Sequence, residues 1–119
     1  MNKILYSPTF GGYNYSDDFT KAWFTHKGIP YKYVQETEWW AFFEDPNDSN
    51  IPLTITEPRH SKELIAFLEN YRTKGLNPSG KHADIQIAKI KGNQYMIDEY
   101  DGNESVLEPA DMDWIIIED

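Results

Sequence analysis

Residues 61–75 read SKELIAFLENYRTKG, and this stretch decides which class of fold the chain can adopt. Its large apolar residues recur at intervals of three and four positions, which places them on one face of a helix: Leu64, Ile65, Leu68 and Tyr71. Ser61 is a suitable N-cap, and Gly75 is suited to close the C-terminal end. We therefore predict a helix over residues 60–74 with one face in the core.

A second helix is predicted upstream, over residues 17–27. Ser16 can cap its N-terminus, and the carboxylates of Asp17 and Asp18 suit the positive end of the helix dipole. Gly28 ends the pattern. Four residues fall on one face of this helix: Phe19, Ala22, Trp23 and His26, the last near the C-terminal end, where a cation is favourable.

The segment DIQIAKIKGNQYMIDEY at 84–100 has the pattern of paired strands. Two β-like runs, 84–91 and 94–100, flank Gly92 and Asn93, and a glycine at the first central position favours a type II′ hairpin turn. Further strands are predicted over 3–7, 31–34, 52–56, 105–107 and 114–117, with turns over 46–52 and 108–113. Residues 34–44 fit a strand or a short helix equally well. The whole chain, 1–119, is thus predicted to be a single α+β domain, with two helices packed on one face of a mostly antiparallel sheet.

Composition excludes several classes of protein. The chain has no Cys, so it has no disulfide, thiolate nucleophile or Cys-ligated zinc site. The longest apolar runs, at 39–43 and 114–117, are too short to span a membrane, and the N-terminus lacks the pattern of a signal peptide. A net charge of -9 opposes direct binding of nucleic acid, and 15% aromatic residues oppose disorder. We expect a soluble, cytoplasmic protein with no membrane partner.

The negative charge is concentrated at the C-terminus. Residues 98–119 contain nine Asp and Glu and no Lys or Arg, whereas the acids and bases balance before Asp98. The simplest explanation is a solvated face whose acids suppress aggregation of edge strands, while the apolar residues of the segment fill the core. On this interpretation, the fold does not depend on four of the acids: Asp101, Glu104, Asp111 and Asp113. The inward-facing residues would be Ile97, Val106, Leu107, Trp114, Ile115 and Ile117.

The loop SPTFGGYNYS at 7–16 lies between a predicted strand and a predicted helix, where phosphate-binding loops occur. Its glycines do not match GxGxxG or GxxxxGK, and the acidic start of the following helix would repel a phosphate. The loop could instead stack its aromatic rings on a flat ligand, with glycines that allow close backbone approach: Phe10, Gly11, Gly12, Tyr13 and Tyr15. The alternative is a flexible turn whose aromatic side chains cover the core.

Other polar residues give weaker signals. The three histidines, in HKG, HSK and HAD, match no paired catalytic motif. Arg59 and Lys81 are small basic points that could receive an anionic group, although exposed charge near a turn also explains them. The sequence DEYDGNE at 98–104 lacks the spacing and the distal Glu of a calcium loop. We predict no catalytic residue, cofactor or bound metal.

Two segments carry a resemblance to a known group of proteins. KILYSPTFGGYN near the start and YMIDEYDGNESV near the end resemble small acidic proteins of phages and prophages, which open with an ILYSPGFGAG-like segment and close with an IEEYDGSES-like segment. The present chain differs at Thr9 and Tyr13. The resemblance implies a phage-encoded accessory protein that acts against a host defence system, and it brings no established activity with it.

Three functions remain open from the sequence. The first is non-catalytic capture of a small nucleotide-like ligand between the aromatic loop and the acidic turn, which a homo-oligomer could help to close. The second is an acidic inhibitor, similar to a DNA mimic, of a basic surface on a host defence nuclease. The third is a metal-assisted nucleotide phosphodiesterase. The predicted ligand site comprises Phe10, Gly11, Gly12, Tyr13, Tyr15, Arg59, Lys81, Asp98, Glu99, Asp101 and Glu104.

Overall fold

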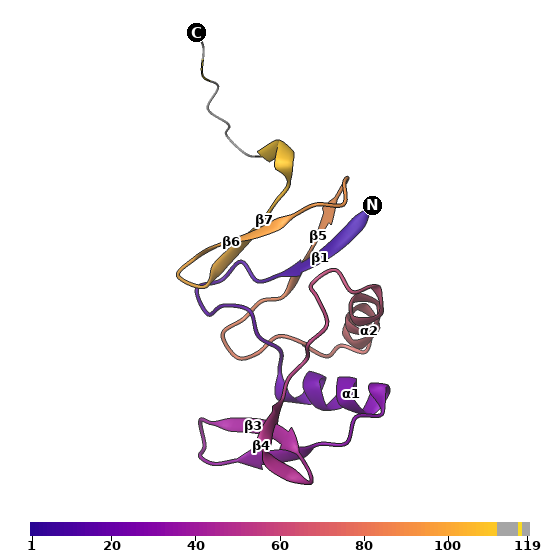
Figure 1. Cartoon of the computed structure of the whole chain (residues 1–119), viewed down its shortest axis with the longest axis vertical. Coiled ribbons are helices and arrows are strands. Elements are labelled where there is room, and N and C mark those ends of the chain that lie inside the picture. Colours follow the sequence, from indigo (N-terminus) through magenta and orange to yellow (C-terminus); the bar gives the residue numbers. More distant parts are fainter. Residues whose placement is uncertain (112–116, 118–119) are drawn as a thin grey trace.

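The computed structural model describes residues 1–111 and 117 (Figure 1). Within them the chain forms two α-helices and seven strands, and every strand pair is antiparallel. This confirms the predicted α+β class. In chain order the elements are β1 (Asn2–Tyr6), α1 (Asp17–Lys27), β2 (Lys32–Gln35), β3 (Ala41–Asp45), β4 (Asp48–Leu53), α2 (Lys62–Thr73), β5 (Gln86–Ile90), β6 (Met96–Tyr100), β7 (Asn103–Leu107) and the short 3-10 helix η1 (Pro109–Asp111).

Helix α1 has the predicted bounds, whereas α2 begins two residues later and ends one residue earlier than the predicted 60–74; the predicted N-caps are confirmed in both. The Ser16 side chain accepts a hydrogen bond from the amide of Phe19, and the Ser61 side chain accepts one from Leu64. Gly28 adopts a left-handed conformation with φ 68°, which few residues other than glycine tolerate, and it closes α1. Neither helix is long and apolar enough to cross a membrane, and the described residues hold no other α-helix.

The strands form three small sheets rather than one, and the predicted hairpin around Gly92 and Asn93 is wrong. The sheets have the orders β1-β5, β2-β3-β4 and β6-β7, so β5 pairs with the N-terminal strand and β6 pairs with β7. A type II′ turn needs positive φ at its first central residue, and Gly92 does not have it. The tight turn lies instead at Asp101 and Gly102, whose φ values of 51° and 87° match the twist of a two-residue hairpin.

The middle sheet settles one open question and corrects one prediction. Within residues 34–44, the ends belong to strands β2 and β3 and none of the segment is helical, while residues 36–40 connect the two strands as a hairpin loop. The predicted turn over 46–52 is mostly strand: only Pro46 and Asn47 turn, and β4 occupies Asp48–Leu53 rather than 52–56. Pro52 is tolerated because β4 lies at the edge of its sheet. The predicted strand over 114–117 falls outside the described residues, apart from Ile117, which belongs to no strand.

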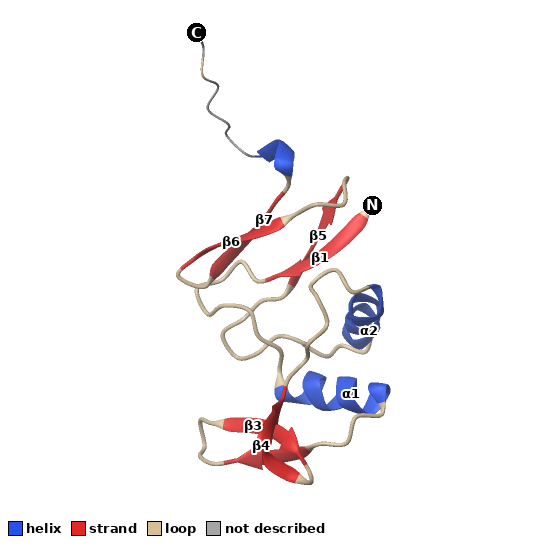
Figure 2. Cartoon of the chain, viewed as in Figure 1, coloured by secondary structure: helices blue, strands red, loops and turns tan. Residues whose placement is uncertain are grey.

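The helices lie in the middle of the molecule, with sheets on both sides along its long axis (Figure 2). The hydrophobic core lies around the two helices. Its largest buried side chains include Phe19, Trp23, Phe24, Leu64, Leu68 and Ile85. The Phe24 ring packs against Phe43 of β3 at a centroid distance of 5.5 Å, and Phe19 packs against Tyr71 of α2 at 5.1 Å. Because α1 packs against β3 while α2 contacts β1, the helices are shared by two sheets and do not cover one face of a single sheet.

Leu68 tests this assignment of the core. It is fully buried on α2, so replacing it by Ala removes apolar contacts and leaves a cavity. Leu68→Ala is expected to lower the free energy of unfolding, measured by urea titration, by about 2–5 kcal/mol. Leu76→Ala is the matched control, because Leu76 is 47% exposed beyond the end of α2. A loss below about 0.5 kcal/mol for Leu68→Ala would contradict the core position, since changes of that size are typical of surface sites.

Candidate aromatic groove and buried ion pair

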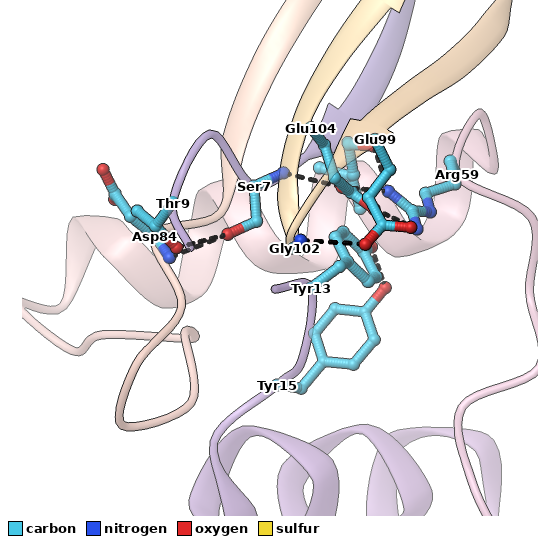
Figure 3. A network of polar contacts seen from close by, with 10 residues as sticks. Ser7, Thr9, Tyr13, Tyr15, Arg59, Asp84, Glu99, Gly102 and Glu104 are labelled. Atoms are coloured by element: carbon cyan, nitrogen blue, oxygen red, sulfur yellow. Dashed lines mark hydrogen bonds and ion pairs between the residues drawn. The ribbon is translucent and has the colours of Figure 1, made fainter. Parts of the chain in front are cut away.

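A buried carboxylate joins the β6–β7 hairpin to the segment that follows β1. Glu104 on β7 is only 7% exposed and accepts two hydrogen bonds from the Arg59 guanidinium, at 2.5 and 2.9 Å. The backbone amide of Ser7 donates a third, at 2.9 Å, and the amide of Glu104 donates back to the Ser7 carbonyl at 3.0 Å. Glu104 therefore connects β7, the residue after β1 and the segment before α2 (Figure 3). The expectation that Glu104 is a solvated acid is wrong.

The ion pair continues into the aromatic loop. The Arg59 guanidinium lies 3.6 Å from the centroid of the Tyr13 ring, an attractive cation–π arrangement. The Tyr13 hydroxyl is hydrogen-bonded to that of Tyr15, whose ring stacks on Phe19 of the core at 5.4 Å. Tyr13 therefore packs against the ion pair, and Tyr15 packs against α1.

Burial and hydrogen bonding set the protonation states of this chain of contacts. Burial raises the pKa of Tyr13 and of Tyr15, so both hydroxyls stay protonated near neutral pH. Burial alone would lower the pKa of Arg59, but the hydrogen bond and charge of Glu104 outweigh it and raise the pKa. The guanidinium and the two phenols therefore keep one charge state over the physiological range.

The glycine loop and the acidic turn come together, as the sequence suggested, but they are in direct contact. A Cβ on Gly102 would lie 2.6 Å from the carbonyl oxygen of Phe10. A Cβ on Gly11 would lie 1.8 Å from the carbonyl oxygen of His82. The amide of Gly12 donates to the Thr9 carbonyl. Gly11 and Gly102 therefore allow backbones to touch, whereas Gly12 has open space around it but a positive φ of 81°; the space between Phe10 and Gly102 has no room for a ligand.

A hollow opens on the other side of Tyr13 and Tyr15. It measures about 530 Å³ and lies between the loop entering α1 and the strands β3 and β4. A second hollow of about 340 Å³ shares Tyr15, Asp17 and Trp40 with it and extends to Trp39 and Lys81. We call the two together the aromatic groove. Its aromatic lining consists of Tyr13, Tyr15, Trp39, Trp40, Phe42 and Phe43.

Two exposed tryptophans form one rim of the groove. Trp39 and Trp40 lie in the β2–β3 connection and are 77% and 61% exposed. The connection is ordered by the amide of Glu36, which donates to the Trp40 carbonyl at 3.0 Å, and by Thr37, whose hydroxyl accepts from the Trp39 amide. Lys81 lies 4.9 Å from the Trp39 ring centroid. Exposed indoles held beside a hollow are characteristic of binding surfaces.

Only three of the predicted site residues line the aromatic groove: Tyr13, Tyr15 and Lys81. Arg59 and Glu104 bind each other, and the Phe10 side chain is exposed and lines neither hollow of the groove. Glu99 accepts a hydrogen bond from the Gly102 amide, while Asp98 and Asp101 are exposed on the β6–β7 hairpin.

Sequence reasoning missed Trp39 and Trp40, together with Asn14 and Asp17 on the opposite wall. A signal was available. Successive side chains of an extended segment point to opposite faces, so where only one face of a sheet is covered, one of two adjacent tryptophans points away from the core.

The described residues hold no group of three His, Asp or Glu placed to bind a metal ion. Comparison of the chain with protein-family models, with curated proteins and with solved structures finds no match.

The role of Glu104 can be tested by removing its charge and keeping its shape. Glu104→Gln leaves the partly buried guanidinium of Arg59 without a counter-charge, so the free energy of unfolding is expected to fall by about 1–3 kcal/mol. Asp98→Asn, on the exposed face of the same hairpin, is the control and should change it by less than about 0.5 kcal/mol. Equal effects of the two replacements in urea titrations would show that the ion pair does not hold the hairpin.

Proposed function

We propose that the protein is a phage-type accessory protein that captures a small nucleotide-like ligand, without chemical change, in the aromatic groove. On this proposal it acts against a defence system in the cytoplasm of the host. The observation that carries the binding proposal is a hollow lined by the exposed Trp39 and Trp40 together with Tyr15, in whose described lining Lys81 is the one cation. The resemblance of the terminal segments to phage proteins supports the setting.

The groove has the chemistry of a site for a flat ring with an anionic group. Tryptophan and tyrosine faces stack on a base without any charge, which suits an acidic protein. Within the groove lining, Lys81 is the side chain that can meet a phosphate, whereas Asn14 and Asp17 can bond to ring nitrogens or ribose hydroxyls. Asp17 is held in place because it accepts a hydrogen bond from the Tyr33 hydroxyl at 2.8 Å.

A set of ligands can test this proposal through the melting temperature and Trp fluorescence. Nucleosides and their monophosphates should raise the melting temperature of the wild-type chain. Trp40→Ala should weaken binding by about 1–3 kcal/mol, the range found for loss of one stacking contact. Lys81→Gln should weaken the binding of the monophosphates and leave the affinity for the nucleosides unchanged. Chromatography of the recovered ligand should show it intact.

Ile51→Ala is the matched control, because Ile51 is an exposed apolar residue of β4 in the same sheet. It should leave every affinity unchanged. A panel that produces no stabilisation at millimolar ligand would contradict the proposal, as would affinities that Trp40→Ala does not alter. If the recovered ligand were chemically altered, the protein would be an enzyme and the proposal of capture without chemical change would be wrong.

A second candidate is an acidic inhibitor of a basic protein, and the β6–β7 hairpin favours it. Within the described residues β6 pairs only with β7, and Asp98, Glu99 and Asp101 are exposed on this hairpin. Tyr100, which is 80% exposed among them, has the amphipathic character of an interface anchor.

The double replacement Asp98→Asn with Asp101→Asn distinguishes the second candidate from ligand capture. If the hairpin binds a basic nuclease, the replacement should slow association and reduce its dependence on salt, as measured by surface plasmon resonance. Ligand affinity in the aromatic groove should be unchanged. Nuclease binding that is insensitive to both the replacement and salt would exclude the acidic hairpin as the contact.

A further inference from the structure

A second pair of hollows is built on β1, the end of β5 and the start of α2. One hollow measures about 310 Å³ and the other about 250 Å³, and both are lined by Asn2, His60 and Lys62. We call them the basic hollow. It shares no lining residue with the aromatic groove.

The polar lining of the basic hollow consists mainly of hydrogen-bond donors. The smaller part is lined by His60, Lys62, Asn93 and Tyr95 and by no carboxylate, although the chain has 20 Asp and Glu. The larger part contains Glu69, which is already bound by the ammonium group of Lys3 at 3.0 Å. Across residues 1–111 and 117, no carboxylate forms an ion pair with Lys62.

The donors stand on a rigid apolar base. Ile4 and Ile90, on paired strands, and Ile65, on α2, are almost completely buried and contribute to the lining. The imidazole of His60 is oriented by a hydrogen bond of 2.8 Å between its Nδ1 and the Tyr95 hydroxyl. When Tyr95 donates to Nδ1, the Nε2 of His60 carries the proton and is a donor.

From this arrangement we propose that the basic hollow is a binding site for the phosphate group of a small phosphate monoester. A cation without a carboxylate partner, flanked by imidazole, amide and phenol groups, suits an anion with several oxygen acceptors. Ile65 and Ala66, in the larger part, provide an apolar surface for the organic portion of the ligand. The site is independent of the proposed capture of a ligand in the aromatic groove.

The test uses the full chain labelled with ¹⁵N and titrated with phenyl phosphate, inorganic phosphate and benzoate. Phenyl phosphate should give saturable shifts of the amide signals of Asn2, His60, Lys62 and Tyr95, with a Kd near the millimolar range. Inorganic phosphate should shift the same signals with lower affinity, because it has no ring to cover the apolar base. Benzoate, with one charge and two oxygens, should bind more weakly than phenyl phosphate.

Lys62→Gln should weaken the binding of phenyl phosphate about tenfold, which is equivalent to about 1.4 kcal/mol. Lys74→Gln is the matched control, since Lys74 is an exposed lysine at the other end of α2. The proposal is overturned if phenyl phosphate gives no saturable shifts at these residues. It is also overturned if benzoate binds as tightly, or if both lysine replacements weaken binding equally, because general electrostatic attraction would then explain the result. Binding of nucleosides in the aromatic groove should be the same in all variants.

Discussion

The ion pair between Arg59 and Glu104 is the interaction on which the arrangement of the chain depends. A carboxylate that is almost fully buried is costly unless a cation and hydrogen-bond donors compensate it, and here the guanidinium and the Ser7 amide do so. Because these three groups come from the C-terminal hairpin, the segment before α2 and the end of β1, the hairpin is held against the N-terminal strand. The small β6–β7 sheet would otherwise have little of the main core to pack against, since the buried apolar cluster lies around the helices.

The same pair determines what the aromatic loop can do. Arg59 lies on one face of Tyr13, so that face is closed to a ligand, and the open hollow is the one on the side of β3 and β4. The acidic turn is separated from this hollow because Gly102 is in contact with Phe10. The proposed ligand site therefore uses rings and one lysine, Lys81, whereas the exposed carboxylates of the hairpin face solvent. The basic hollow differs from the aromatic groove, because its polar lining consists mainly of hydrogen-bond donors around a base of isoleucines.

Local signals in the sequence predicted the helices well and the site only in part. The caps Ser16 and Ser61 and the apolar spacing of α2 act within a few residues, so their effect can be read without knowing the fold. Tyr13, Tyr15 and Lys81 were identified as candidates because rings near glycines and isolated cations have recognisable chemistry. Trp39 and Trp40 were missed because residues 34–44 fitted two periods, and only the pairing of β2 with β3 places both indoles at a turn.

The sequence by itself determined the α+β class, the bounds of α1, most of α2 and the concentration of acid after Asp98. These follow from composition and from interactions between residues close in the chain. Tertiary structure alone decided that β5 pairs with β1, that the helices are shared by two sheets and that Glu104 is buried while its neighbours are solvated. Strand pairing depends on partners far away in sequence, and each strand here has a pattern compatible with several of them. Among the six acids of residues 98–111, the burial of Glu104 depends on a single arginine 45 residues away, and no local pattern specifies that distance.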